Sequence, residues 1–440
     1  MRNLRFKEIV LAALRREPSL GGIRTLPDAE SGKGHRALHW LDESGLALSF
    51  WRQLEKFGET RRIAIDWQDA LRARAARNLK RMEEMKKEFR RLLRTFAECG
   101  VRAVAMKGFT LVPDFCEDAH LRHQVDFDFL VEPEALAKAA VALCAAGYWA
   151  RHLKSNGETC FTTPLRHIPS HSDNVYEVQR HRQVDLHLGI WEELEWTSIM
   201  APVDCVKRAE VRIFEGEKSL ELSLEDKFLL HVLHIYRHSL RSWARLSWIL
   251  ELCRFLDLHG TEEALWNRIV ARAGDSRAMK SAFAFVLGLA ERVFQRPLPG
   301  RMRAWMSEAL SGPLEVWLDN FGCEWALSDW PGSLSNVLIA SELIGDSGMQ
   351  GAYWRNRIWP RNAQTSIGDV ECADSSMWVK LQLARMAYMA QRALLHARDL
   401  CRLPVEQRRW RHALEASGRR ACHANCRIAR GYRRGIIWKH

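Results

Sequence analysis

The sequence predicts an α+β protein in which a small mixed β-sheet core is flanked by a helical N-terminal arm and a large helical C-terminal region. Three observations support this prediction. Apolar residues recur every three or four positions before Gly100, short β-prone runs follow up to about residue 200, and helical periodicity returns from Ser223. The chain has 440 residues, 47% of them hydrophobic, which is enough for two or three cores.

The N-terminal arm is predicted to end in a long helix. Apolar side chains at positions 79, 82, 85, 89, 92, 93 and 96 fall on one helical stripe, and Gly100 follows as a stop. Residues 18–34 are rich in Gly, Ser, Pro and Asp and are predicted to form a loop. We expect four parts: a helical arm at 1–99, an α+β core at 100–200, a helical domain at 201–345, and a helical, basic C-terminal region at 346–440.

Within the core, the first strand is predicted at 101–106 and breaks at Lys107-Gly108, after which a short helix is expected up to about Asp118. A helix is expected from Pro133, which suits its first turn, to Gly147, which suits its end. Further β-prone runs predict strands at 125–131, 148–154, 160–163, 175–179 and 182–188.

The run VDFDFLV at 125–131 carries two carboxylates in a strand that is otherwise apolar. Side chains alternate along a strand, so Asp126 and Asp128 share one face, and Val125, Phe127 and Phe129 are expected to face a core. Two neighbouring carboxylates repel each other, and a divalent cation such as Mg²⁺ offsets that repulsion. The same pattern also suits a solvated end of an edge strand.

A second acidic strand strengthens the metal interpretation. In VDLHL at 184–188, Asp185 lies between apolar residues, as the two earlier aspartates do. If the two strands are neighbours, three carboxylates on adjacent strands can hold two metal ions for a displacement at phosphorus. His187 shares the face of Asp185 and is expected near the acceptor.

Lys107 and Gly108 are predicted to bind phosphate. They end a strand and open a predicted helix, where backbone N–H groups and a lysine charge suit phosphates. Arg122 is expected to reach phosphate or to brace Asp126, although a surface ion pair explains it equally well. His231, His234 and His238 share one face of a predicted helix and suit either packed polar structure or a role beside the metals.

These pieces, in order, resemble a known family. The chain reads A-M-K-G, then R-x-x-x-D-F-D-F-L-V, then a helix ending A-A-G-Y, then V-D-L-H, and later L-L-H-V-L-H-I-Y-R-H with R-L-S-W-I-L-E-L. It is similar to the uncharacterised nucleotidyltransferase family of the polymerase-β-like superfamily, over roughly residues 60–260. The resemblance implies Asp126, Asp128 and Asp185 as metal ligands and Lys107-Gly108 as the nucleotide-binding turn. Phe109 replaces the serine usual in that turn.

The resulting hypothesis is a metal-dependent nucleotidyltransferase. It would use Mg²⁺ or Mn²⁺ and an NTP such as ATP, with RNA, protein, sugar and small molecules all open as acceptors. A glycosyltransferase with a metal-binding D-x-D is one alternative, but it explains Asp185 less well. A non-catalytic module that binds nucleotides or nucleic acid is the other.

The net charge of +12 is concentrated at the C-terminus, where residues 401–440 carry eleven Lys and Arg against two Glu. With Trp410, Tyr432 and Trp438 interleaved, this segment suits nucleic acid or an anionic surface, or simply a solvated basic helix. No export signal or membrane-spanning segment is expected, and the eleven cysteines, with no CxxC pair, suit reduced thiols, so we expect a cytoplasmic protein.

Overall fold

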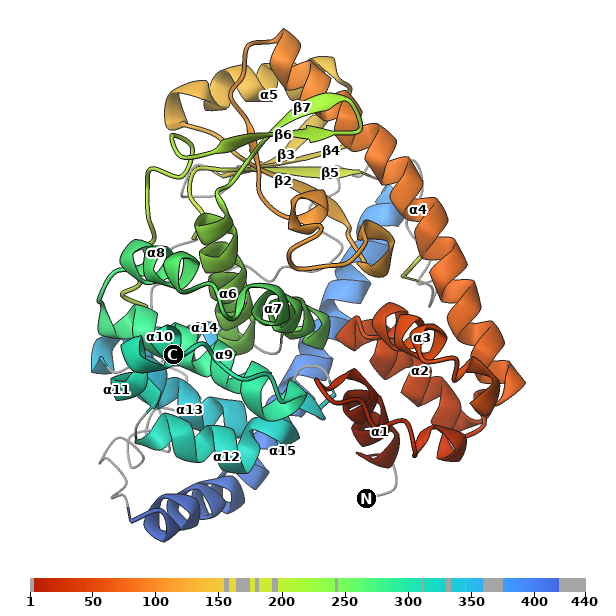
Figure 1. The fold of residues 1–440 in the computed structure, drawn as a ribbon, viewed down its shortest axis with the longest axis vertical. Helices are drawn as coiled ribbons and strands as arrows, with labels where there is room; N and C mark the ends of the chain where they lie inside the picture. The colour runs from red at the N-terminus through yellow and green to blue at the C-terminus, as the bar shows by residue number, and fades with distance from the viewer. Residues whose placement is uncertain are drawn as a thin grey trace.

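A computed structural model describes residues 4–153, 158–163, 175–178, 182–191, 197–241, 244–310, 312–329, 334–344, 346–358 and 375–418. Figure 1 shows a sheet near one end of the molecule, with α4 and α5 on one side of it and the helices of the C-terminal half on the other. The predicted α+β class is confirmed, since a mixed sheet and many helices are both present in this part of the chain.

The N-terminal arm is helical, as predicted. The stripe that was expected in α4 packs on the sheet from Met82 to Phe96, whereas Leu79 at its start is 48% exposed. Gly100 follows α4 with φ of 56°, a left-handed conformation that favours glycine. The helices of the arm are α1 (Leu4–Leu14), α2 (Gly32–Ser44), α3 (Ala47–Lys56) and α4 (Ile65–Glu98).

The sheet has seven strands among the described residues, in the order β3-β4-β5-β2-β1-β7-β6. The pairs β2–β5 and β1–β7 are parallel, and the other neighbours are antiparallel. The helix α5 (Leu136–Ala145) follows β2 and ends before Gly147, as predicted. The strands are β1 (Val104–Ala105), β2 (Asp126–Leu130), β3 (Trp149–Leu153), β4 (Thr159–Thr162), β5 (Gln183–His187), β6 (Glu210–Phe214) and β7 (Glu217–Glu221).

Four local predictions were wrong. No strand was predicted after residue 188, but the sheet continues through β6 and β7 to Glu221. Strand β6 reads E-V-R-I-F, and its apolar Val211 and Ile213 are exposed at the edge of the sheet. Residues 175–178 form a turn rather than a strand. The helix expected after Gly108 is only a short 3₁₀ turn, Gly108–Leu111, and Val125 is exposed instead of facing a core.

The two faces of β2 and β5 lie against different hydrophobic clusters. Phe127 and Phe129 pack against Phe89 of α4, with ring centroids 6.0 and 5.9 Å apart, in a cluster that also contains Val184 and Leu186. Leu130, on the opposite face, belongs to the cluster that extends into the helical region. The acidic face of the sheet therefore points toward the helical region.

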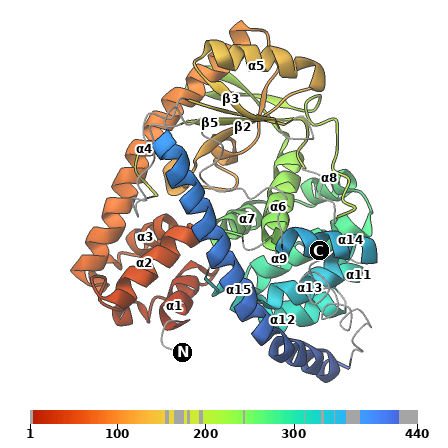
Figure 2. The same cartoon turned by 180° about the vertical axis from the view of Figure 1, so that it is seen from behind.

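The helical region covers the acidic face, and α6 begins at Leu224, as the periodicity predicted. The long helix α15 runs from the sheet end of the molecule to α12 (Figure 2). The helices are α6 (Leu224–Arg241), α7 (Leu246–His259), α8 (Glu263–Ala273), α9 (Arg277–Phe294), α10 (Gly300–Trp305), α11 (Ser307–Leu310), α12 (Pro313–Ala326), α13 (Ser335–Ile344), α14 (Ser347–Ile358) and α15 (Ser375–Ala416).

The C-terminal basic segment is only partly described. Trp410 is fully buried and lies edge-on to Phe321 of α12, so this aromatic side chain serves packing. Tyr432 and Trp438 lie outside the described residues, so their expected contact with an anionic partner stays a prediction. None of the helices described here is both long and apolar enough to cross a membrane. The four-part division also stays a prediction, although one hydrophobic cluster joins residues of the arm to those of the helical region.

Candidate active site

The three aspartates predicted as metal ligands lie on one face of two adjacent strands. Asp128 is directly paired with Asp185 in the parallel register of β2 and β5, and Asp126 is paired with Gln183. Because paired residues of parallel strands project to the same side, the carboxylates of Asp126, Asp128 and Asp185 share the face that points toward α6.

Lys107 lies beside these acids because the chain turns sharply after β1. The backbone N–H of Met106 donates to the carbonyl oxygen of Asp128, which extends the pairing of β1 with β2 by one residue. Gly108 then adopts φ of 64°, and a Cβ there would lie 2.3 Å from the side-chain nitrogen of Gln124. Only glycine fits this turn without a shift of its neighbours.

Asp128 is buried and receives two cationic groups. The Lys107 Nζ lies 2.9 Å from its Oδ1 and the His187 Nε2 lies 2.8 Å from the same atom. Burial alone would raise the pKa of Asp128, but the charge of Lys107 and the hydrogen bond from His187 hold it well below its usual range. On the other side of the imidazole, His187 Nδ1 lies 3.2 Å from Glu158.

The histidine is therefore held as a cation. Burial by itself would lower the pKa of His187, but its hydrogen bonds to Asp128 and Glu158 raise it to about 9. The acid face thus supplies its own positive charge, from Lys107 and His187, to neutralise Asp128.

Asp126 has no such partner among the described residues. Burial, followed by repulsion from Asp128, raises the pKa of its carboxyl group to about 7. Among the described residues, Asp185 accepts from one side chain, the Gln183 amide, whose nitrogen lies 3.1 Å from each carboxylate oxygen. Within the part of the chain that the structure describes, the hydrogen bonds of Lys107 Nζ and His187 Nε2 therefore go to Asp128 and leave Asp126 and Asp185 without a contacting cation.

This donor set fits a divalent cation. Asp128, Asp185 and His187 each place a possible ligand atom within 4.8 Å of the others. His187 can serve as a ligand only after it loses its proton, because a protonated imidazole has no lone pair for a metal. Carboxylate oxygens are the ligands that Mg²⁺ and Mn²⁺ prefer, and the raised pKa of Asp126 marks a carboxylate that a nearby cation would stabilise in its charged form.

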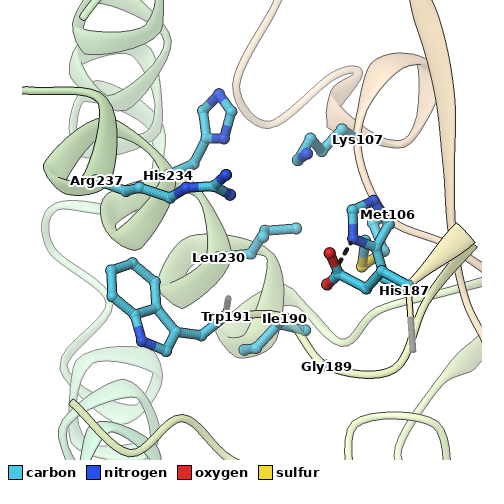
Figure 3. A pocket seen from close by; sticks show the side chains of 10 residues that line it. Met106, Lys107, His187, Gly189, Ile190, Trp191, Leu230, His234 and Arg237 are labelled. Atoms are coloured by element: carbon cyan, nitrogen blue, oxygen red, sulfur yellow. Dashed lines mark hydrogen bonds and ion pairs between the residues drawn. The ribbon is translucent and has the colours of Figure 1, made fainter. Parts of the chain in front are cut away.

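A pocket opens beside His187, between the sheet and α6. Figure 3 shows Arg237 and His234 on α6 across from Lys107 and His187. The rest of the lining is largely apolar, and it includes Trp191, whose buried indole N–H has no hydrogen-bond partner among the described residues. The lining consists of Met106, Lys107, Glu158, His187, Gly189, Ile190, Trp191, Leu230, His234 and Arg237.

Arg122 forms an ion pair with a buried acid, Glu251 of α7. Its Nε lies 2.5 Å from Glu251 Oε1, and both side chains are about nine-tenths buried. Burial alone would lower the pKa of Arg122, but the Glu251 charge raises it. The phosphate contact expected for Arg122 stays a prediction, because the structure gives its hydrogen bonds to Glu251.

The three histidines of α6 do not form one cluster of ligands among the described residues. The His231 ring contacts Glu251 at 3.1 Å and the Trp248 carbonyl oxygen at 3.0 Å. His234 and His238 lie against the Trp248 ring, and burial lowers the pKa of each. Packing thus accounts for His231 and His238, whereas His234 also lines the pocket.

Several residues of the site were not anticipated from the sequence. Gln183 was detectable, since it precedes Asp185 by two positions and so shares its face. Glu158 was not, because it lies in a short polar stretch with no periodic signal. Arg237 and Trp191 come from segments that only the fold brings to the acids.

Comparison with known proteins identifies one family. The model of a family described as "uncharacterised nucleotidyltransferase" matches residues 31–295, which include every residue of the candidate site named above. No curated protein and no solved structure matches the chain.

Proposed function

The chain belongs to the uncharacterised nucleotidyltransferase family, and from that premise we propose that it transfers a nucleoside monophosphate from an NTP to an acceptor hydroxyl, with release of pyrophosphate. The observation that carries this proposal is the register of β2 and β5, in which Asp128 is paired with Asp185 and Asp126 shares their face. A folded chain gains no packing from three carboxylates at such positions, which supports a role in binding a cation.

The three carboxylates would hold two divalent ions, Mg²⁺ or Mn²⁺, which neutralise the triphosphate and activate the acceptor hydroxyl when bound. Lys107, at the turn after β1, would contact the phosphates of the NTP. The adjoining pocket, with a volume of about 30 Å³, lies where the nucleotide would begin to extend from the phosphates, and it is lined by the Trp191 ring and an apolar wall.

The transfer balances without a covalent enzyme intermediate. The acceptor oxygen forms a bond to the α-phosphorus, and the bond from that phosphorus to the oxygen bridging to the β-phosphorus breaks. The hydroxyl proton passes to the Asp185 carboxylate, which has a single side-chain hydrogen-bond partner among the described residues, Gln183. Positioning and neutralisation of charge supply most of the rate in such a reaction.

The test is a transfer assay with labelled nucleotides. The purified full-length protein is incubated with each α-labelled NTP, Mg²⁺ or Mn²⁺ and cell extract. The double variant Asp126→Asn/Asp128→Asn serves as the inactive control. Glu134→Gln is the matched control, since it removes one exposed carboxylate just after β2.

The proposal predicts a labelled product with the wild type and with Glu134→Gln, and none with the double variant. The size of the product reports whether the acceptor is RNA, a protein or a small molecule. The absence of label with every NTP, from a protein shown to be folded, would contradict transfer. Binding of NTP without turnover would then indicate a nucleotide-binding module.

A further inference from the structure

A second group of cationic side chains lies beside Asp126. Arg81 of α4, His123 of the loop before β2 and Arg245 at the start of α7 are joined in a chain. The Arg81 NH1 and the His123 Nε2 meet at the Val175 carbonyl oxygen, which lies 2.6 Å from the first and 2.7 Å from the second, and the Arg245 NH1 lies 2.9 Å from His123 Nδ1. The imidazole therefore donates to this oxygen at Nε2 and accepts from Arg245 at Nδ1.

The positive charges of this group have no acid in direct contact among the described residues, although the charge of Asp126 acts on both Arg81 and Arg245. Arg81 is 1% exposed, and its NH1 and NH2 groups donate to the backbone carbonyls of Val175 and Gln124. Among the residues that the structure describes, no carboxylate lies within ion-pair distance of Arg81 or Arg245. Burial, followed by the charges of Arg182 and Arg245, lowers the pKa of Arg81 to about 10.

Buried arginines elsewhere in the molecule are compensated. Arg74 makes two hydrogen bonds to Asp42, Arg122 pairs with Glu251, and Arg272 pairs with Asp226. Burying a guanidinium without an acid is costly, and the usual compensation is an anion. The contrast indicates that the group at His123 is built to bind an anion from outside the protein.

The position of the group relative to the acids is specific. His123 lies three residues before Asp126, and the NH2 of Arg81 holds the carbonyl of the intervening Gln124. Lys107, in contrast, contacts Asp128. Cationic groups therefore flank the pair of aspartates on two sides, one at Asp128 and the other near Asp126. A transferase that brings two substrates together at the acids could bind one substrate with each cationic group.

We propose that Arg81, His123 and Arg245 form an anion subsite that binds a phosphate group of the acceptor. The inference rests on the proposed function and narrows the acceptor to a phosphorylated molecule. Two guanidinium groups match the double negative charge of a phosphate monoester better than the single charge of a carboxylate. Arg81 supplies fixed charge, His123 orients Arg245, and the half-buried Arg245 reaches the ligand.

The test measures binding of inorganic phosphate to the full-length protein by calorimetry, without metal or nucleotide and at constant ionic strength in chloride. Arg245→Gln removes one charge of the group. Arg254→Gln removes the same charge from the same helix, where the side chain only caps the Pro113 carbonyl, and is the matched control. Arg81 is left intact because its two backbone contacts make a folding defect the expected result of its removal.

We expect the wild type and Arg254→Gln to bind phosphate alike, and Arg245→Gln to bind it at least about tenfold more weakly. Equal phosphate affinity in Arg245→Gln and Arg254→Gln would overturn the subsite. Displacement of phosphate from the wild type by metal-free ATP would assign the group to the nucleotide and overturn the acceptor assignment.

The phosphate-binding measurement and the transfer assay can fail independently of each other. A protein that transfers no nucleotide but loses phosphate binding only in Arg245→Gln would keep the subsite and refute the transferase. A protein that transfers nucleotide with an unchanged acceptor KM in Arg245→Gln would keep the transferase and refute the subsite.

Discussion

On one face of strand β2, Phe127 and Phe129 are buried against Phe89 of α4. On the opposite face lie Asp126 and Asp128, and Lys107 and His187 contact Asp128. The aromatic face gains free energy of folding by removing apolar surface from water. The acidic face loses free energy through desolvation and repulsion, which its own cations offset only in part. The aromatic face of β2 therefore stabilises the fold, whereas the acidic face costs stability and needs another explanation.

Within the acidic face, Asp126 and Asp128 differ in how far cationic side chains neutralise them. Asp128 is neutralised by Lys107 and His187, and its pKa is held low. Asp126 has no cation in hydrogen-bond contact among the described residues, and burial and Asp128 raise its pKa to about 7. The structure thus tolerates one carboxylate that opposes folding, as expected where a site is built for a ligand.

The largest expected effect is that of Asp126→Asn, which should lower the transfer rate without lowering the free energy of unfolding. We expect Asp126→Asn to lower the transfer rate by roughly 10³-fold, the order for removal of one group that stabilises transition-state charge. The same change removes a repelled, buried charge, so the free energy of unfolding should stay equal or rise. Rate and urea unfolding measured on the same preparation check both parts, and a marked loss of stability would contradict the contrast with the aromatic face.

The aromatic face should respond in the opposite way. Phe129→Ala removes a fully buried ring and should lower the free energy of unfolding by about 3–5 kcal/mol. The fraction that remains folded should keep its affinity for Mn²⁺, because Phe129 points away from the acids. Chemical unfolding, followed by metal titration below the unfolding midpoint, measures the two quantities separately. A weakened metal affinity with stability unchanged would reverse the assignment of the two faces.

Arg122 tests whether a residue next to the acids serves structure or phosphate. Arg122→Met leaves Glu251 buried without its guanidinium, and this should cost about 3 kcal/mol of stability. The KM for NTP should change little, because the hydrogen bonds of Arg122 go to Glu251. A raised KM with full stability would instead return Arg122 to phosphate binding.

The smallest effect concerns α6, which covers the acidic face. Burial, and then the charges of Arg237 and Arg241, lower the pKa of His238 from 6.5 to about 3. The unfolded chain therefore binds a proton that the folded chain excludes, and stability is lost as the pH falls from about 6.5 toward 3.

Relative to His238→Gln, the wild type should lose about 2 kcal/mol of stability between pH 7.5 and pH 5. Urea unfolding of both proteins at the two pH values gives this difference. His234 is present in both proteins, so its own titration cancels. A pH-independent difference would mean that folding does not change the pKa of His238, and would contradict its burial as a neutral ring.

The part of this architecture that local patterns determine was predictable. Alternation along 125–131 predicted a shared face for Asp126 and Asp128, and the glycine stops predicted the ends of α4 and α5. The pairing of β2 with β5 was only a hypothesis, since Asp128 and Asp185 are far apart in sequence and strand neighbours are fixed by the whole sheet. The run E-V-R-I-F of β6 does alternate polar and apolar residues, so this edge strand was within reach of the sequence although it was not predicted.

Contacts between distant segments were the least predictable. The partner of Arg122 is Glu251 on α7, and the group at His123 takes Arg81 and Arg245 from two helices that the sequence gives no reason to join. Glu158 likewise reaches His187 from a stretch with no pattern of its own. Pairs of this kind depend on tertiary packing, which single-sequence periodicity does not report.

The central claim is that the acidic face of β2 and β5 binds a divalent cation, and calorimetric titration of Mn²⁺ tests it most directly. The wild type and Glu134→Gln should bind Mn²⁺ with the same affinity, and Asp126→Asn and Asp185→Asn should bind it at least about tenfold more weakly. Equal affinity in all four proteins would contradict the claim, because it would mean that these carboxylates are not the ligands.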